Sequence, residues 1–305
     1  MEKLIDSLPP KVTDLEETLK LCEPTTEVSC HLFEITLEQL RNIIRKMKTS
    51  NASGPDSISS RVVKDCLPII EESLLHLVNL SLGTSIFPSC LKVAKVIPMV
   101  KPGKDPLDQA SFRPISNLST LGKIIEKAGF TQIMNHINSQ GLINNRQHGG
   151  RKGLSTNTCV LEVLNEVNKA KENKMLVGIL AIDMSAAYDL VNHQILLQKL
   201  SIMGLASHTL LWVQDFLSKR QQCVDICGRM SDTIFTGEQG VVQGGASSGD
   251  LFLIYLNSIP ECIPRPGHSK PGVLASQYVD DVTLVVFGKK QTTAANCSSR
   301  KLPQH

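Results

Sequence analysis

The chain has 305 residues, of which 41% are hydrophobic and 20% are charged, and its formal net charge is +3. This is a globular composition with enough apolar material for a core, and the length fits one large domain or two smaller ones. The small net charge permits nucleic-acid binding, but any basic surface must then arise from local clustering of charge.

Several targeting and metal-binding features are missing. The N-terminus has no long apolar segment behind its charges, so we expect no secretory signal. No apolar run approaches the roughly 18 residues that a membrane-spanning helix needs. The nine cysteines are an odd number, and their spacing does not form the paired CxxC pattern of a zinc site. We therefore expect an intracellular protein with free thiols and no membrane association.

The N-terminal part of the chain predicts a tail followed by helices. Residues 1–34 are weakly periodic and are predicted to be a tail or linker. Thr36 and Gln39 have the spacing of a capping box, which predicts that a helix begins there. Apolar residues then recur at helical spacing, at Leu40, Ile43, Ile44 and Met47. A second helix is expected over 60–82, where Pro68 should kink or split it.

The middle of the chain predicts one strand and two helices. Residues 91–100 have the composition of a β-strand, and a basic loop follows at 101–106. Helices are predicted over about 121–137 and, as a long amphipathic stretch, over about 156–171.

The last third contains the longest apolar segments. The unbroken apolar run at 175–182 predicts a central strand buried on both faces. Helical sequence follows over about 194–217, an edge hairpin is expected at 223–235, and 251–256 should form a second buried element. Two short β-prone runs, 273–278 and 282–287, then predict a hairpin.

Three acidic residues stand at the ends of these predicted strands. Asp183 follows the apolar run, and Asp280 and Asp281 lie in the turn of the last hairpin. Carboxylates brought close together repel one another unless cations bridge them. Oxygen ligands without histidine or thiolate suit Mg²⁺, and a pair of such ions supports phosphoryl transfer. The alternative is that Asp280 and Asp281 are only a polar turn.

The motifs around these acids resemble those of a known family. Tyr278-Val279-Asp280-Asp281 is similar to the Tyr-x-Asp-Asp motif of reverse transcriptases. Residues 181–189, with Val191-Asn192-His193 after them, resemble the preceding palm motif of the enzymes from non-LTR retrotransposons. Further segments match in the same order, at 53–56, 112–116, 147–149, 240–244 and 251–257. The chain is thereby identified as a member of the non-LTR (LINE-type) reverse transcriptases over about 36–289.

The resemblance implies an α+β fold of the right-hand polymerase type. Fingers would occupy 35–174, and a palm with an antiparallel sheet packed on helices would occupy 175–289. The tail at 290–305 would be unstructured. Because the chain ends soon after the Tyr-x-Asp-Asp motif, we expect it to be truncated, with the thumb absent. The strand at 282–287 would then have an unprotected edge.

The resemblance also implies a set of site residues. Asp183, Asp280 and Asp281 would hold two Mg²⁺ ions, with Mn²⁺ as an alternative, and Tyr188 would exclude a ribose 2′-OH. The remaining contacts implied are to the nucleotide, from Gln243, Gly244, Arg113 and Lys101, and to template phosphate, from Arg151 and Lys152. The implied reaction is attack by a DNA primer 3′-OH on the α-phosphate of a dNTP, directed by an RNA template.

Other interpretations stay open at this point. Tyr188 could be a half-buried core aromatic residue, and Lys101 could belong to a merely solvated loop. The chain could be a catalytically inert, nucleic-acid-binding remnant of an element, or an RNA-directed RNA polymerase, against which Tyr188 argues. Val242 and Gly245 replace a usual proline and serine of the family, and Gly150 replaces a phenylalanine, but no metal ligand is lost. Template specificity and oligomeric state are not predicted by the sequence.

Overall fold

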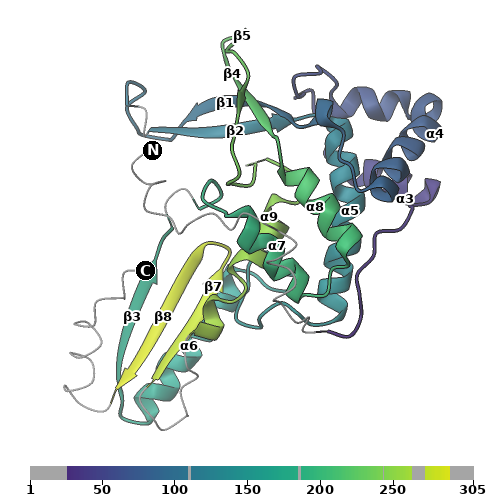
Figure 1. Cartoon of the computed structure of the whole chain (residues 1–305). Helices are drawn as coiled ribbons and strands as arrows, with labels where there is room; N and C mark the ends of the chain where they lie inside the picture. The colour runs from purple at the N-terminus through teal and green to yellow at the C-terminus, as the bar shows by residue number, and fades with distance from the viewer. Residues whose placement is uncertain (1–25, 109–110, 185–186, 243, 263–271, 289–305) are drawn as a thin grey trace. The chain divides into compact units, whose positions relative to one another are not determined.

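Figure 1 shows a computed structural model of the chain, which describes residues 26–108, 111–184, 187–242, 244–262 and 272–288. Helices and strands divide between two compact units, the first formed by residues 1–136 and 192–240 and the second by 137–191 and 241–305. The predicted α+β class is confirmed. Within the described residues, no helix is both long and apolar enough to cross a membrane.

The first unit begins with the predicted helices. α3 (Leu37–Lys46) starts with the expected capping box, in which Gln39 N–H donates to Thr36 Oγ1 at 3.2 Å and Thr36 N–H donates to Gln39 Oε1 at 2.8 Å. α4 (Ser60–Thr84) runs continuously through Pro68, so the predicted split is wrong. Pro68 lies on the exposed side of the helix, where water can satisfy the carbonyl that it leaves unpaired.

A mixed sheet forms one part of this unit. After a short 3₁₀ helix η1 (Ser89–Leu91), β1 (Val93–Val100) pairs antiparallel with β2 (Phe112–Leu118) and parallel with β4 (Gln221–Ile226). β5 (Arg229–Met230) and β6 (Ile234–Phe235) pair with β4. The hairpin predicted at 223–235 therefore exists, but its first strand lies inside the sheet. Hydrogen bonding to the distant β1 decides this position, which local sequence does not encode.

Helices form the other part of the unit. α5 (Thr120–Ser139) precedes α7 (His193–Ile202) and α8 (Ser207–Leu217), so the predicted helical stretch at 194–217 is two helices. They are separated at Gly204, whose φ of 85° suits glycine. Backbone hydrogen bonds join Cys30 to Gly204 and Ala206, at 2.8 and 3.0 Å. The end of the segment predicted as a tail is thus packed against the turn between these helices.

An aromatic cluster with a buried arginine fills the core of this unit. Trp212 is completely buried and lies among three phenylalanines, Phe87, Phe130 and Phe216. Arg220, only 5% exposed, places its guanidinium 4.2 Å from the centroid of the Phe216 ring and donates from Nε to the Phe216 carbonyl at 2.8 Å. Burial lowers the pKa of Arg220 to about 10, while the charges of Glu126 and Asp215 act in the opposite direction.

We expect Arg220→Met to destabilise the chain by about 1–3 kcal/mol, because it removes the hydrogen bond to the Phe216 carbonyl, the cation–π contact and a positive charge that interacts with Glu126. Urea unfolding followed by the fluorescence of Trp212, the only tryptophan, measures the change. The double variant Arg220→Met/Glu126→Gln should recover part of the loss, since the buried charge is then removed as well. A loss below about 1 kcal/mol for the single variant would contradict this account.

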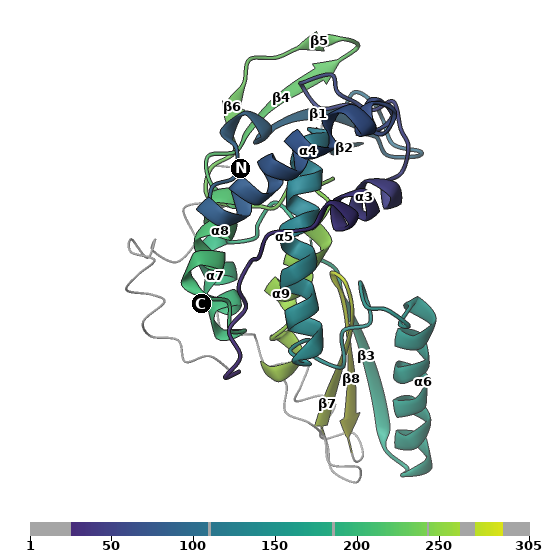
Figure 2. The same ribbon diagram turned by 90° about the vertical axis from the view of Figure 1, so that its right-hand side faces the viewer.

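The second unit is built on a three-stranded antiparallel sheet. Its strands are β3 (Leu176–Ile182), β8 (Asp281–Gly288) and β7 (Gly272–Tyr278), in the order β3-β8-β7. α6 (Thr156–Glu172) covers one face of this sheet, as Figure 2 shows. The buried residues between helix and sheet are Ala170, Met175, Leu274, Val285 and Phe287. α9 (Ser248–Leu256) forms the predicted second buried element, and the 3₁₀ helix η3 (Ile259–Cys262) follows it.

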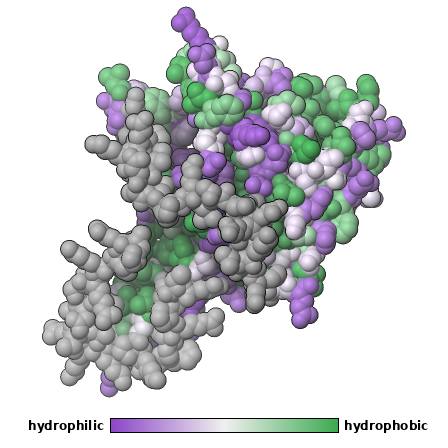
Figure 3. Space-filling model, viewed as in Figure 1, coloured by the Kyte–Doolittle hydropathy of each residue, from purple (hydrophilic) through white to green (hydrophobic). Residues whose placement is uncertain are grey.

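Two expectations about this sheet were wrong. β3 is an edge strand with mostly exposed side chains, not a central strand buried on both faces. The strand at 282–287 belongs to β8, which lies between its two neighbours and has no free edge. Leu176, Leu180 and Ile182 lie on the face opposite α6 and are 46%, 55% and 39% exposed. Figure 3 shows green apolar side chains on this side of the molecule. The side chains of β3 are therefore apolar although exposed, and the apolar run alone does not indicate burial.

Candidate active site

The strand register brings the three predicted carboxylates to one end of the β3-β8-β7 sheet. Ile182 pairs with Val282, so Asp183 follows β3 beside Asp281, the first residue of β8. Asp281 in turn pairs with Tyr278, which leaves Val279 and Asp280 as a two-residue loop. Opposed Cα atoms in antiparallel strands lie about 4.5–5.5 Å apart. Residues distant in sequence therefore meet at this sheet end.

The carboxylates fit Mg²⁺ in donor type more than in preformed geometry. Among the residues that the structure describes, no three histidine, cysteine, aspartate or glutamate side chains are grouped closely enough to hold a metal ion by themselves. Asp183 and Asp281 are exposed, and Asp280 is half-buried. Mg²⁺ usually retains waters and binds through one or two carboxylates together with substrate phosphates. The donor set is therefore suitable, although the chain alone does not form a closed cage.

Tyr188 lies within electrostatic reach of Asp280. Its ring stacks on Phe252 of α9, with centroids 4.5 Å apart and an interplanar angle of 17°. Its carbonyl accepts a hydrogen bond from the Val241 N–H at 2.8 Å. Burial, and to a smaller extent the charge of Asp280, raises the pKa of the Tyr188 phenol. The side chain is thus a neutral, rigidly supported aromatic group within electrostatic reach of the carboxylate turn.

Of the two residues predicted to contact the nucleotide after this segment, Gly244 is described and Gln243 lies outside the described residues. Gly244 is exposed, and its φ of 115° is a conformation that residues with a side chain rarely adopt. The neighbouring Ser248 hydroxyl donates to the Val242 carbonyl at 2.6 Å, which fixes the start of α9.

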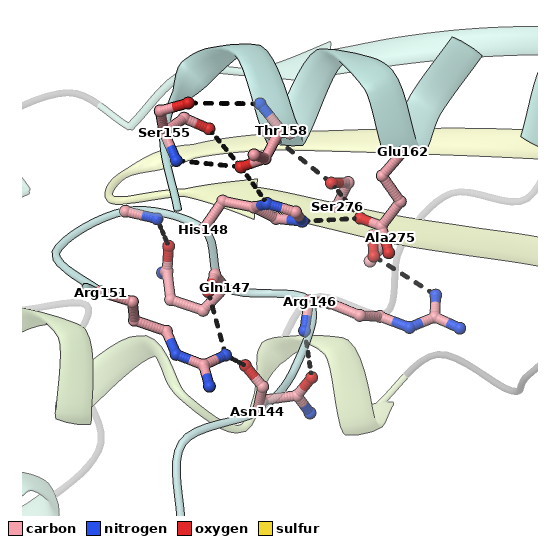
Figure 4. A network of polar contacts seen from close by, with 12 residues as sticks. Asn144, Arg146, Gln147, His148, Arg151, Ser155, Thr158, Glu162, Ala275 and Ser276 are labelled. Carbon is pink, nitrogen blue, oxygen red and sulfur yellow. Dashed lines mark hydrogen bonds and ion pairs between the residues drawn. The ribbon is translucent and has the colours of Figure 1, made fainter. Parts of the chain in front are cut away.

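The segment Gln147-His148-Gly149 is fastened to the same sheet. His148 places Nδ1 2.9 Å from Thr158 Oγ1 and Nε2 3.1 Å from Glu162 Oε2, and the Ser276 hydroxyl donates to the same glutamate oxygen at 2.6 Å. Figure 4 shows this network between the loop, α6 and β7. The motif at 147–149 did not by itself indicate a role for these residues. Some of their partners, such as Val279, lie more than a hundred residues away in the sequence.

The two basic residues after this segment differ in their surroundings. The Arg151 guanidinium donates from Nη1 to the carbonyls of Asn144 and Gln147, at 3.1 and 3.4 Å, and so holds the preceding loop (Figure 4). Lys152 is exposed. Of this predicted pair, Lys152 therefore presents its charge to solvent, while Arg151 also has a structural contact.

The two other predicted cationic residues belong to the first unit. Arg113 pairs with Met99 in the β1–β2 hairpin, and the Lys101 N–H donates to the Ser111 carbonyl at 2.8 Å just beyond the strands. Arg113 is exposed and Lys101 is half-buried. Both therefore lie toward the same end of one hairpin.

Comparison with known proteins gives consistent matches. Residues 100–301, more than half of the chain, match the family described as "Reverse transcriptase (RNA-dependent DNA polymerase)". The RNA-directed DNA polymerase from mobile element jockey of Drosophila funebris is 31% identical over 254 residues, which cover 82% of this chain and 27% of that protein. Its counterpart in Drosophila melanogaster is 30% identical over 275 residues, which cover 90% of this chain and 30% of that protein.

A third relative is the probable RNA-directed DNA polymerase from transposon BS of Drosophila melanogaster. It is 26% identical over 273 residues, which cover 88% of this chain and 30% of that protein. The chain thus spans 27% to 30% of the length of these curated relatives.

Proposed function

Because the chain belongs to the reverse transcriptase family, we propose that it performs RNA-directed DNA synthesis, in which a dNTP extends a primer 3′-OH. Its relatives from mobile elements agree with the non-LTR, LINE-type branch. The observation that carries the proposal is the register of β3 and β8, which brings Asp183 to the sheet end that holds Asp280 and Asp281. Mg²⁺ binds through one or two carboxylates together with substrate phosphates, so exposed or half-buried acids at one sheet end suit a cation-dependent site.

We assign Asp183 and Asp280 as ligands of two Mg²⁺ ions, or of Mn²⁺, with Asp281 contributing at the same site. When bound, such ions lower the pKa of an attacking hydroxyl and stabilise the charge of a leaving pyrophosphate. The chain itself contributes the negative charge that retains the ions and the sheet that fixes the spacing of the ligands. No side chain is required to act as a general base.

Tyr188 is assigned as the group that selects the sugar. Its ring stacks on Phe252, and the phenol is neutral at physiological pH, since its pKa is raised above an ordinary value that is already well above 7. A rigid aromatic ring beside the carboxylates would collide with a ribose 2′-OH and leave room for deoxyribose. The neighbouring contacts to nucleotide and template are assigned to Gln243 and Gly244, and the exposed, positive-φ backbone of Gly244 suits close approach by a ligand.

The remaining assignments rest on the family resemblance. Arg113 and Lys101 would bind the triphosphate, where cations offset the charge that develops in the transition state. Arg151 and Lys152 would contact template phosphates. In the same way, we assign residues 35–174, with the β1–β2 hairpin and α6, to the fingers and residues 175–289, with the β3-β8-β7 sheet, to the palm of a right-hand polymerase.

Primer extension tests this function. The full chain is incubated with a DNA primer on an RNA template, with dNTPs and Mg²⁺ or Mn²⁺, beside the double variant Asp280→Asn/Asp281→Asn. We expect template-dependent extension by the native chain, which EDTA abolishes and which the double variant lacks. Equal extension by the native chain and the variant would indicate a contaminating polymerase and overturn the assignment.

The alternative, an inert remnant that binds nucleic acid, predicts a different pattern. A folded native chain would then bind the primer–template without extending it under either metal ion. Binding measured by fluorescence anisotropy on the same preparation distinguishes this outcome from a chain that neither binds nor extends.

A further inference from the structure

Two buried glutamines contact Val279, which lies with Asp280 in the turn between β7 and β8. Gln147 and Gln277 are both completely buried. The Gln147 side chain accepts a hydrogen bond from the Val279 N–H at 3.0 Å, and its Nε2 faces the Val279 carbonyl at 3.4 Å. Gln277 Nε2 donates to the same carbonyl at 3.0 Å. Burying a primary amide is costly unless it is hydrogen-bonded, so two of them at one peptide unit require an explanation.

The Gln147 carboxamide takes the place of a neighbouring strand. In the hairpin, Tyr278 and Asp281 form the last pair, so the peptide groups of Val279 have no partner from the ladder. A carboxamide offers one acceptor and one donor at the spacing of a peptide unit, and it meets the N–H and the carbonyl of the same residue. The Gln147 side chain thus supplies the hydrogen bonds that a neighbouring strand would otherwise offer to Val279.

Val279 is in a conformation that needs such support. Its φ is +57°, which is unfavourable for a β-branched residue, and such positions persist only where the surroundings hold them. It precedes Asp280 directly. The backbone rotation at Val279 therefore sets where the Asp280 carboxylate points, and a turn that relaxed would move this carboxylate.

The rest of the Gln147-His148-Gly149 segment fixes the glutamine in place. The Gly149 N–H also donates to Gln147 Oε1, at 2.8 Å, and the His148 N–H donates to the Gln277 carbonyl at 2.8 Å. A Cβ atom on Gly149 would lie only 2.4 Å from the Val279 nitrogen. Any side chain at this glycine would therefore push against the turn, which accounts for glycine at this position.

We propose that Gln147, seated by Gly149, is a positioning residue that holds the strained Val279 turn and thereby orients Asp280 and Asp281 for binding divalent cations. This role rests on the proposed polymerase function for its biological meaning. The effect of Gln147 on the Val279 turn and on cation binding can be measured without catalysis.

Two readouts independent of catalysis test the proposal on the full chain. The first is hydrogen exchange of the Val279 amide, followed by NMR, and the second is a Mn²⁺ titration followed by electron paramagnetic resonance. In Gln147→Met, which keeps the length of the side chain, we expect the amide to lose its protection and Mn²⁺ binding to weaken about tenfold. Gly149→Ala should do the same, because it displaces the turn from the other side.

The matched control is Glu166→Gln, which removes one charge from α6 at a residue that pairs with Lys169 on the same helix and not with the 147–149 segment. It should keep native Val279 protection and native Mn²⁺ affinity. If Gln147→Met does not fold, Gln147→Ser replaces it, since its short side chain cannot reach either the N–H or the carbonyl of Val279. Native protection or unchanged Mn²⁺ affinity in the folded Gln147 variant would overturn the proposal.

Primer extension separates failure of this role from failure of the proposed function. If the native chain extends primers and the Gln147 variants need no more Mg²⁺ for half-maximal rate, the positioning role is wrong and the polymerase assignment stands. If the native chain does not extend primers while Mn²⁺ binding still falls in the Gln147 variants, the positioning role stands and the polymerase assignment is wrong.

Discussion

Asp183→Asn is expected to reduce the rate of primer extension about a thousandfold, the upper range for the loss of one preorganised electrostatic group in an active site. The substitution keeps the size of the side chain and removes one of the negative charges that would retain the cations. Asp183 comes from β3, whereas the other two acids come from the β7–β8 turn, so the variant tests whether the strand register assembles one site. Steady-state rates over a range of Mg²⁺ concentrations measure the effect.

The same substitution should not lower the stability of the fold. Asp183 is exposed, so replacing its carboxylate should leave the thermal midpoint of the variant close to that of the native chain. Glu172→Gln, at the exposed end of α6 in the same unit, removes one charge elsewhere and should leave the rate within about twofold. If the folded Asp183→Asn chain extended primers at the native rate, Asp183 would not be part of the active site.

Tyr188→Ala is expected to reduce discrimination against ribonucleotides about a hundredfold. A pocket that rejects an additional hydroxyl by shape achieves discrimination of roughly this size, and removal of the ring removes the obstacle. The quantity to measure is the ratio of kcat/KM for a deoxynucleotide to that for the matching ribonucleotide. Because the ring also packs on Phe252, a moderate loss of stability should accompany the change.

Tyr188→Phe is the matched control for the sugar selection. It keeps the ring and its stacking on Phe252, so the selectivity should remain within about threefold of native if the ring itself is the obstacle. Unchanged selectivity in an active Tyr188→Ala chain would instead identify Tyr188 as a core aromatic residue, the alternative that the sequence left open.

Local signals were sufficient for much of the fold. The capping box at Thr36 fixed the start of α3, helical periodicity located α5 and α6, and two short β-prone runs predicted the β7–β8 hairpin with two acids at its turn. The order and spacing of the motifs indicated the family, which the match over residues 100–301 confirms. Each of these signals depends on residues within one helix turn, one hairpin or one short motif.

The position of each strand within its sheet is decided by pairing between distant segments of the chain and not by local sequence. The run ending at Ile182 is apolar whether its strand is central or at an edge, and only its pairing with β8 places it at the edge. β2 was not predicted as a strand, because Pro114 argues locally against a strand. Its strand conformation becomes evident only from its pairing with β1. Local composition does not contain the identity of the neighbouring strand.

The sequence by itself determined the family, the helices, the hairpin and the acids that belong to the candidate site. Only the tertiary structure decided which other side chains lie around those acids. Gln147 contacts Val279, 132 residues away in the sequence, and the Tyr188 ring stacks on Phe252 of α9. Catalytic motifs can be read from a sequence because chemistry restricts their residue types. Their supports are set by distances between chain segments, and one sequence does not encode these in any local pattern.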